Sequence, residues 1–443
     1  MFRLINFFKQ NLAYLAGLYI LIQFIYIIFF PVQYRSDSLY YYKLAQECLS
    51  SNSFYPAQIH LYEDYIAAPL YVNLLVIILT IFNSTLSIGI LNICLNILQL
   101  FILYKITLLL FGENTAKITA VLYIFYLNTL GLVITNYTEL FFGVLSLGSI
   151  YFFLRGKKAD FFFAGVLAAA SIGVRPLGWA LITAYILIFI FKYFRKIKLY
   201  SAPFQLISGT AAFIILFGLF NLSHFGIFLY TSTTGPVNLL MGANEYATGS
   251  FKDIVSGENK PGFIPYSEKK TYIEKGEIWK ARACDWIKAH PLKWLSLIPV
   301  KAGSMFLWDD FAVSPLMNMQ DWDLYKIAKY VKENNSSRGL MAEFSALRKI
   351  SYLSLQFLHY FYYITLIIFI TAGIIVLRRN NGFNTENIIP LLFSIIGVVI
   401  TLSVYGIPRY KYPFLIAMLP FAAFFLIQII QKKEPDLIKS KYD

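Results

Sequence analysis

Charged residues are scarce in this chain. They make up 14% of its 443 residues, whereas hydrophobic residues make up 58% and aromatic residues 18%. Soluble globular domains contain about 25% charged residues, so this composition excludes an ordinary soluble protein of this length. We predict an all-α polytopic membrane protein that forms a single integral membrane domain over residues 1–443.

Cysteine and histidine are also rare, and nucleotide-binding motifs are absent. The three cysteines, Cys48, Cys94 and Cys284, have no motif spacing, and the four histidines are scattered along the chain. The residues therefore predict neither a disulfide framework nor a metal site. No Walker A or Rossmann glycine pattern occurs, so ATP-driven transport and direct use of a nucleotide-sugar have no visible site.

The basic residues, which give a formal net charge of +14, lie in short clusters between apolar runs. Cytoplasmic loops retain lysine and arginine, so this pattern indicates membrane topology and excludes nucleic acid as a partner. The clusters are Arg3/Lys9, Lys105/Lys117, Arg155 to Lys158, Lys192 to Lys198, Arg378/Arg379 and Lys432/Lys433.

Apolar runs long enough to cross a membrane predict ten spans, the first of which is a retained anchor. The runs are 12–30, 88–109, 117–134, 139–154, 159–174, 177–193, 203–225, 353–377, 386–405 and 411–430. With the amino terminus inside, all six basic clusters are cytoplasmic if 67–82 and 291–308 do not cross and instead form interfacial or re-entrant helices. If both cross, the number of spans becomes twelve.

This orientation places the larger polar regions on the extracytoplasmic face. They are a first loop, 31–87, with amphipathic helices, and a long segment, 226–352. The cytoplasmic loops are short and basic. Any chemistry is therefore expected outside, with a substrate that arrives there already activated.

Asp37 is the first candidate for that chemistry. It follows the first span, and Leu39, Tyr42 and Leu49 recur after it at helical spacing, so Ser36 or Asp37 is the expected N-cap of a surface helix. The carboxylate serves either as that cap or as a general base that accepts a proton from an acceptor hydroxyl. The nearby Glu63 and Asp64 are interpreted mainly as solvated loop charges.

Glu139 opens the fourth span on the same side as Asp37. A carboxylate in the first turn of a helix is favoured by the helix dipole, which is its simplest explanation. The preceding turn is very short and nearly uncharged, however, and this favours a role in bridging a substrate or a metal.

Two basic turns face the same side. Arg175, before Pro176, separates two apolar half-runs, and Arg409 and Lys411 precede the last span. A guanidinium binds phosphate in a fork geometry, so the two turns are predicted to clamp a lipid phosphate. The alternatives are that Arg175 snorkels to bulk lipid and that Lys411 remains a hydrated surface charge.

The long outer segment contributes a further polar turn between Gly242 and Gly249. Asn244 and Glu245 lie within it and are candidates for binding a sugar.

The order of these features resembles the GT-C class of polyprenyl-phosphate-sugar-dependent glycosyltransferases, in particular relatives of protein O-mannosyltransferases and lipid A aminoarabinose transferases. The resemblance covers nearly the whole chain. It is carried by Asp37 with Tyr40 and Ala45, Pro69-Leu70-Tyr71, Glu139, Gly173-Val174-Arg175-Pro176, Gly242-Ala243-Asn244 to Gly249, and Arg409-Tyr410 with Pro413.

The resemblance implies a GT-C-like bundle of about ten to twelve transmembrane helices, in a bacterial cytoplasmic membrane, with an extracytoplasmic active site. Asp37 is then the catalytic carboxylate and Glu139 the second acid. Arg175 and Arg409 are implied to bind the lipid phosphate of the donor, and Tyr40 is grouped with the substrate-binding residues. Many relatives have paired acids in the first loop, whereas Asp37 stands between two serines, so a divalent metal stays open as a cofactor.

The expected activity is transfer of a sugar from a polyprenyl-phosphate donor to a protein, lipid or glycan acceptor. Two other functions remain open. One is a transporter or flippase of lipid-linked sugars, for which intramembrane charges are normal. The other is an O-antigen polymerase or ligase.

Overall fold

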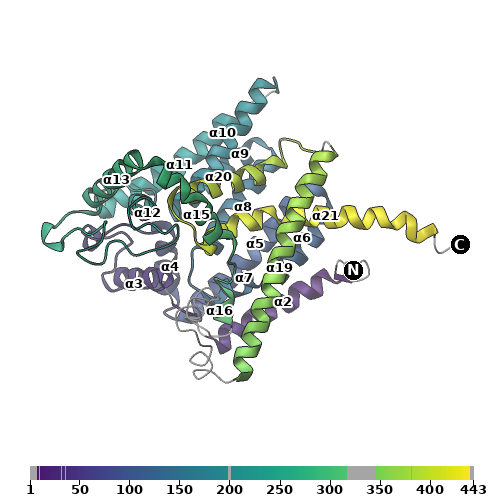
Figure 1. Ribbon diagram of the computed structural model, residues 1–443, viewed down its shortest axis with the longest axis horizontal. Helices are drawn as coiled ribbons and strands as arrows, with labels where there is room; N and C mark the ends of the chain where they lie inside the picture. Colours follow the sequence, from purple (N-terminus) through teal and green to yellow (C-terminus); the bar gives the residue numbers. More distant parts are fainter. Residues whose placement is uncertain are drawn as a thin grey trace.

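The computed structural model describes residues 7–8, 10–30, 32–34, 36–197, 201–316, 346–380 and 382–439. Within these ranges the regular structure is helical, apart from an isolated parallel bridge between Gln33 and Thr135. The all-α prediction is confirmed, and Figure 1 shows the helices of the bundle lying side by side. The Arg3/Lys9 cluster, Lys198 and the part of the long segment from 317 to 345 lie outside the described residues, as do the side chains of Lys432 and Lys433.

All ten apolar runs are helical. They correspond to α2 (Leu12–Phe29), α5 (Thr85–Phe111), α6 (Glu113–Phe125) with α7 (Leu127–Gly131) and η2 (Leu132–Ile134), α8 (Glu139–Arg155), α9 (Lys158–Val174), η3 (Pro176–Gly178) with α10 (Trp179–Phe194), α11 (Ala202–Phe225), α19 (Ala346–Arg379), α20 (Ile388–Val404) and α21 (Tyr412–Lys439). The other helices are α3 (Asp37–Ser50), η1 (Gln58–His60), α4 (Pro69–Ile81), α12 (Gly235–Gly242), η4 (Tyr266–Glu268), α13 (Tyr272–Ala289), α14 (Pro291–Ser296), α15 (Ile298–Phe306), α16 (Val313–Leu316) and η5 (Pro408–Lys411).

Fewer helices than the ten expected are long enough to span by themselves. In the described ranges, six helices meet a length and composition test for a span, and a seventh is added if α6 and the bent segment after it, which turns by 60°, count as one. The helices α8, α9 and α20 have 17 residues each, a rise of about 26 Å against a hydrocarbon core of about 30 Å. They are short because each starts or ends at a polar turn on the same side of the bundle.

The segment 67–82 does not cross the bundle. It forms α4, and the next helix, α5, begins beside the end of α2: Gly89 lies against Ile27, and Asn96 donates hydrogen bonds to Tyr19 and Gln23 one to two turns deeper. Because α5 runs antiparallel to α2, the chain between them leaves and re-enters the bundle on one side. This arrangement agrees with a non-crossing segment at 67–82, which stays a prediction.

The first outer helix, α3, packs on α4 through a face different from the one that its sequence suggested. Tyr41, Leu44 and Cys48 are buried, whereas Leu39 is 38% exposed. The rings of Tyr41 and Tyr71 meet edge to face with their centroids 5.7 Å apart. The buried face of α3 is therefore shifted by about one residue from the predicted face. The packing of α3 against α4 determines which side chains are buried.

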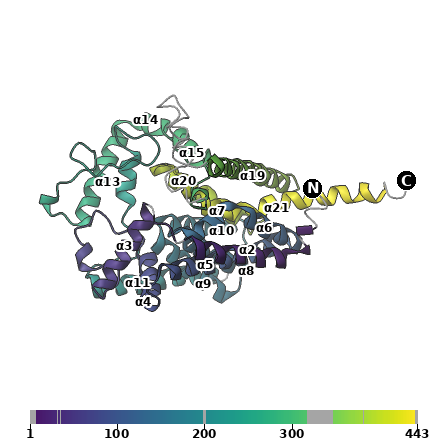
Figure 2. The same ribbon diagram turned by 90° about the horizontal axis from the view of Figure 1, so that it is seen from below.

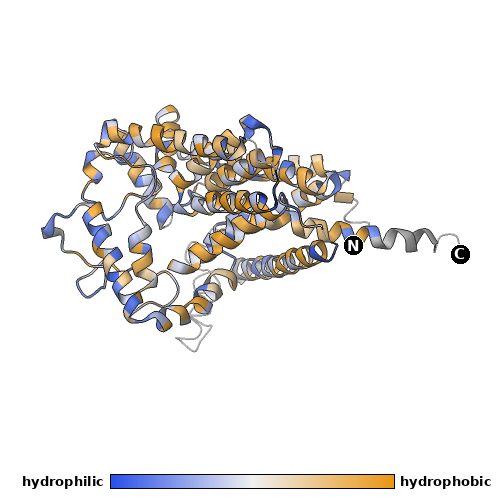
Figure 3. Cartoon of the chain, turned by 90° about the horizontal axis from the view of Figure 1, so that it is seen from above, coloured by the Kyte–Doolittle hydropathy of each residue, from blue (hydrophilic) through white to orange (hydrophobic). Residues whose placement is uncertain are grey.

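The long segment folds over the end of the bundle where α3 and α4 lie. It includes α12 to α16, and Figure 2 places α13 and α14 beyond the ends of the bundle helices. Hydrophilic residues are concentrated at this end, while the remainder is mostly apolar (Figure 3). The junction of the two parts is therefore the place to look for polar chemistry.

Candidate active site

Four charged residues that the sequence analysis selected meet at this junction. Arg175 Nη2 donates a 2.7 Å hydrogen bond to Glu139 Oε1. The same oxygen lies 3.1 Å from Arg409 Nε, and Arg409 Nη2 donates to Asp37 Oδ2. We call this series, Arg175, Glu139, Arg409 and Asp37, the ion-pair chain. It joins residues that the sequence separates by as many as 372 positions.

Each member occupies the end of a helix. Asp37 is the first residue of α3, Glu139 is the first residue of α8, Arg175 follows α9, and Arg409 lies in η5, immediately before α21. The amino-terminal ends of α3 and α8 carry a partial positive charge, which favours both carboxylates. The four side chains thus come together because the ends of these helices lie on the same side of the bundle.

The capping explanation for Asp37 is not what the geometry shows. Ser36 is the N-cap of α3, and no side chain makes a cap hydrogen bond there. The Asp37 carboxylate instead bonds Arg409, and Ser36 Oγ donates to its other oxygen at 3.3 Å. The Asp37 side chain is 39% exposed, and the residue lines a cavity described below.

Glu139 is the buried centre of the ion-pair chain. Its side chain is fully buried, and the side chains of Arg175 and Arg409 are only 10% and 11% exposed. Two acids and two arginines balance in charge, as a buried ionic group requires. The guanidiniums also lie over aromatic rings, at 4.6 Å from the Tyr137 centroid for Arg409 and 5.4 Å from the Tyr410 centroid for Arg175.

The ion-pair chain retains polar atoms without a partner. Glu139 Oε2 and Arg175 Nη1 are buried and make no hydrogen bond. Leaving such atoms unpaired costs about 1–3 kcal/mol each, and more for charged groups.

A cavity of about 530 Å³ opens beside the ion-pair chain, with Asp37 and Arg175 in its wall. Its volume lies in the range of small-molecule sites. Aliphatic residues make up much of the wall, and its aromatic and hydroxyl side chains include Tyr40, Tyr41, Tyr65, Ser232, Thr234, Phe251, Tyr405 and Tyr410. The cavity thus combines three carboxylates, Asp37, Asp64 and Asp253, with the cation Arg175 and with ring surfaces on which a sugar can pack.

The charges around Asp37 set its ionisation. Partial burial raises the pKa of this carboxyl, but the charge and hydrogen bond of Arg409, with the charge of Arg175, outweigh burial and hold the pKa below its ordinary value. Burial also raises the pKa of Tyr65, to about 12. At neutral pH Asp37 is therefore a carboxylate and Tyr65 is a neutral hydrogen-bond donor.

The described residues do not form a divalent-metal site built from protein ligands alone. Such ions take about six oxygen ligands, several of them carboxylates for a site built by protein alone. Among the described residues, no three His, Cys, Asp or Glu side chains gather closely enough to hold a metal ion. Asp37 and Glu139 are both bound to guanidiniums, so no step proposed below involves a metal.

The other candidates lie in different places. Tyr40 lines the cavity, with its ring centroid 6.1 Å from that of Tyr65. Asn244 Nδ2 bonds the carbonyls of Leu240 and Met241 at the end of α12, and Asn244 Oδ1 accepts from the Tyr246 N–H. Glu245 is exposed and lies outside the cavity wall. The structure thus uses Asn244 to end a helix and does not bring Asn244 or Glu245 to the ion-pair chain.

Lys411 does not join the ion-pair chain either, and it is not the hydrated surface charge considered above. Its side chain is 1% exposed. Its ammonium donates to the carbonyls of Met305 and Trp308 and lies 2.9 Å from Asp309 Oδ1. The neighbouring residue of the same turn, Tyr410, lines the cavity.

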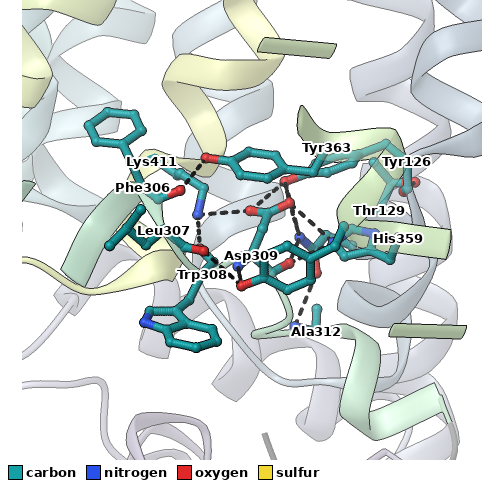
Figure 4. A network of polar contacts seen from close by, with 12 residues as sticks. Tyr126, Thr129, Phe306, Leu307, Trp308, Asp309, Ala312, His359, Tyr363 and Lys411 are labelled. Atoms are coloured by element: carbon teal, nitrogen blue, oxygen red, sulfur yellow. Dashed lines mark hydrogen bonds and ion pairs between the residues drawn. The ribbon is translucent and has the colours of Figure 1, made fainter. Parts of the chain in front are cut away.

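Asp309 was missed by the sequence analysis. It is buried with His359, Tyr126, Asn128 and Lys411, which we call the Asp309 network; Figure 4 shows its carboxylate between Lys411 and His359. Its partners are distant in sequence, so no spacing reveals them. The available signal was a histidine inside an apolar helix, because ionisable residues in such helices are seldom without a role.

Lys301 is a second buried lysine, with a different environment. It has no exposed surface, and its ammonium lies 5.2 Å from the Trp294 ring centroid with no hydrogen-bond partner. Burial lowers its pKa to about 8. The native protein must therefore hold an unpaired charge or release a proton at this position.

We expect Lys301→Met to stabilise the protein. The gain reaches up to about 3 kcal/mol at neutral pH, since one pKa unit corresponds to about 1.4 kcal/mol. It shrinks as the pH rises above about 8, where the native lysine becomes neutral. Thermal unfolding of the purified protein in detergent at pH 7 and pH 9.5 measures both effects. A lower unfolding midpoint for the variant at pH 7 would contradict this account.

No protein-family model matches the chain, and no curated protein matches it. Among solved structures, it is similar to the archaeal oligosaccharyltransferase AglB from Archaeoglobus fulgidus in complex with an inhibitory peptide and a dolichol-phosphate, with 15% identity and a TM-score of 0.48 over 98% of this chain and 52% of that one. It is also similar to ArnT from Cupriavidus metallidurans bound to undecaprenyl phosphate, with 11% identity and a TM-score of 0.40 over 96% of this chain and 80% of that one. The chain spans about half the length of the archaeal protein.

Proposed function

We propose that the protein is a membrane glycosyltransferase that transfers a sugar from a polyprenyl-phosphate donor to an acceptor hydroxyl. The observation that carries the proposal is the ion-pair chain, which places a carboxylate, Asp37, and an arginine, Arg175, in the wall of one cavity. Transfer from a lipid phosphate needs a base for the acceptor and cations for the leaving group. The reaction needs no nucleotide, because the sugar arrives already activated on the lipid phosphate.

In the proposed reaction, the acceptor oxygen attacks the anomeric carbon and its proton passes to Asp37. The bond between the anomeric carbon and the phosphate oxygen breaks, and its electron pair leaves with the polyprenyl phosphate. Arg175, which lines the cavity, donates to that phosphate. Glu139 and Arg409 hold Arg175 and Asp37 in place through the contacts described above.

We further propose that the site faces the extracytoplasmic side of a bacterial cytoplasmic membrane. The basic residues around Arg155 lie at the opposite end of α8 from Glu139. The positive-inside rule assigns that basic end to the cytoplasm. The long apolar tail of a polyprenyl donor would remain among the bundle helices, while its sugar enters the cavity.

Purified protein tests this proposal directly. We expect incubation with a polyprenyl-phosphate-sugar and an acceptor hydroxyl to release polyprenyl phosphate and form a glycoside, both measured by mass spectrometry. Reconstitution in vesicles distinguishes a transferase from a flippase, because a flippase moves the intact donor across the bilayer without releasing polyprenyl phosphate. Movement of intact donor with no product from any acceptor would overturn the proposal.

The low pKa of Asp37 predicts an unusual acid limit for the reaction. Because Asp37 acts as an ionised base, the rate should hold as the pH falls through 6 and 5 and drop only below about 4, the ordinary carboxyl range. Burial raises the pKa of Asp37, and Arg409 is the main cation that lowers it; Arg409→Met removes that cation. The residual activity of this variant should therefore fall off at a higher pH than wild type.

Matched pH-rate profiles of wild type and Arg409→Met check this prediction. The Lys293→Met variant is a suitable control, because it removes an exposed charge outside the cavity wall. Its acid limit should match that of wild type. An Arg409→Met profile that falls at the same or a lower pH than wild type would show that Arg409 does not control the ionisation of Asp37.

A further inference from the structure

The Asp309 carboxylate is completely buried, and both of its oxygens have hydrogen-bond or ion-pair partners. Oδ1 accepts from Lys411 at 2.9 Å, and Oδ2 accepts from the Tyr126 hydroxyl at 2.8 Å and from Asn128 Nδ2 at 3.1 Å, with His359 Nε2 also at 3.1 Å. The Asp309 carbonyl accepts from Asn128 and lies 2.7 Å from His359 Nε2. A buried carboxylate with this many donors holds its surroundings in one arrangement.

The Asp309 network joins four parts of the chain. Asp309 belongs to the long outer segment, just after α15, while Tyr126 and His359 come from the α6–α7 bend and from α19. Figure 4 shows these side chains converging on Asp309 from different helices. Lys411 adds the start of the last helix, because it is the final residue of η5.

The turn η5 connects the Asp309 network to the ion-pair chain. A 3₁₀ helix has three residues per turn, so side chains two positions apart point in directions about 120° apart. Arg409 and Lys411 accordingly face different neighbours: Arg409 donates to Asp37 and forms an ion pair with Glu139, and Lys411 forms an ion pair with Asp309. Rotating the turn to loosen one of these contacts would displace the other.

We infer that Lys411 and Asp309 are positioning residues, which fix the rotation of η5 and so hold Arg409 against Asp37 and Glu139. This role rests on the proposed function, because it is defined by the rate of transfer. Lys411 is not required to touch the substrate: its ammonium is occupied by Asp309 and by two carbonyls. A misplacement of about 1 Å in a catalytic group can lower a rate about 100-fold.

The test is a double-mutant cycle between Lys411 and Arg409. We expect Lys411→Met to lower turnover by about 10- to 100-fold, with less than about a 3-fold change in KM for the donor. In the Arg409→Lys background, the same Lys411→Met change should lower turnover by less than about 2-fold, because Arg409 is no longer there to be positioned. The control is Lys301→Met, a buried lysine of α15 that does not bond Asp309, and it should keep the wild-type turnover.

Folding must be measured beside activity, because Lys411→Met leaves Asp309 buried without its lysine. If that variant does not accumulate as folded protein, Asp309→Asn with Lys411→Met restores charge balance and is carried through the same cycle. Equal fold-losses in the wild-type and Arg409→Lys backgrounds would overturn the inference, as would unchanged turnover in a folded Lys411 variant. Absence of transfer by the wild type would instead refute the proposed function.

Discussion

Asp37→Asn is expected to lower the rate of sugar transfer by about 10²- to 10⁴-fold, the usual contribution of a general base. The amide is nearly the same size as the carboxylate and can still accept a hydrogen bond from Arg409, but it cannot take the acceptor's proton. Release of polyprenyl phosphate under saturating donor measures the loss. The loss in stability should be small, about 1 kcal/mol or less, because the Asp37 side chain is 39% exposed.

The same substitution separates catalysis from helix capping. Asparagine caps a helix as well as aspartate does, so a capping role alone would leave the rate unchanged. Asp64→Asn is the matched control: Asp64 also lines the cavity, but it pairs with Lys275 at 2.9 Å. We expect that variant to retain turnover within about 3-fold, and a fully active Asp37→Asn protein would refute the assignment of Asp37.

Glu139→Gln is expected to have the largest effect on stability. Glu139 Oε1 bonds or pairs with both Arg175 and Arg409, so its neutralisation leaves two buried cations with only Asp37 to balance them. Removing one partner of a buried ion pair costs about 3–5 kcal/mol. Thermal unfolding in detergent should show a lower midpoint than wild type, and transfer should be lost in parallel because Arg175 and Asp37 are no longer held.

A compensating change distinguishes charge balance from damage to packing. Glu139→Gln combined with Arg175→Met restores neutrality and should recover much of the lost stability, while transfer stays low because the phosphate ligand is gone. Glu245→Gln, which alters an exposed carboxylate, should change neither property. If Glu139→Gln unfolds at the wild-type temperature, the ion-pair chain is not a structural centre of the protein.

The sequence predicted the features that local patterns encode. Apolar runs gave the ten helices, and the basic clusters grouped Asp37, Glu139, Arg175 and Arg409 at one end of the bundle, where they are found. It overestimated the number of long spans because hydropathy does not show where a helix stops. The helices α8, α9 and α20 have 17 residues, and Glu139 and Arg175 stand at the ends of α8 and α9.

Features that depend on tertiary contacts were not predictable in this way. Asn244 looks like a sugar ligand in a glycine-flanked turn, but the carbonyls at the end of α12 take its amide. Lys411 looks like a surface charge beside an arginine, yet its partner Asp309 lies 102 residues earlier in the chain. No pattern of spacing connects such residues, because only the folded bundle brings them together.

The order in which the ion-pair chain is synthesised has a consequence for biogenesis. Asp37, Glu139 and Arg175 enter the membrane early, whereas Arg409, which bonds Asp37 across 372 residues, is made with the last helix. Until then the nascent bundle holds two acids and one arginine at the future site, a local excess of negative charge that disfavours tight closure. Insertion of the last helix supplies the missing cation, so assembly of the finished bundle and completion of its active site should be the same late event.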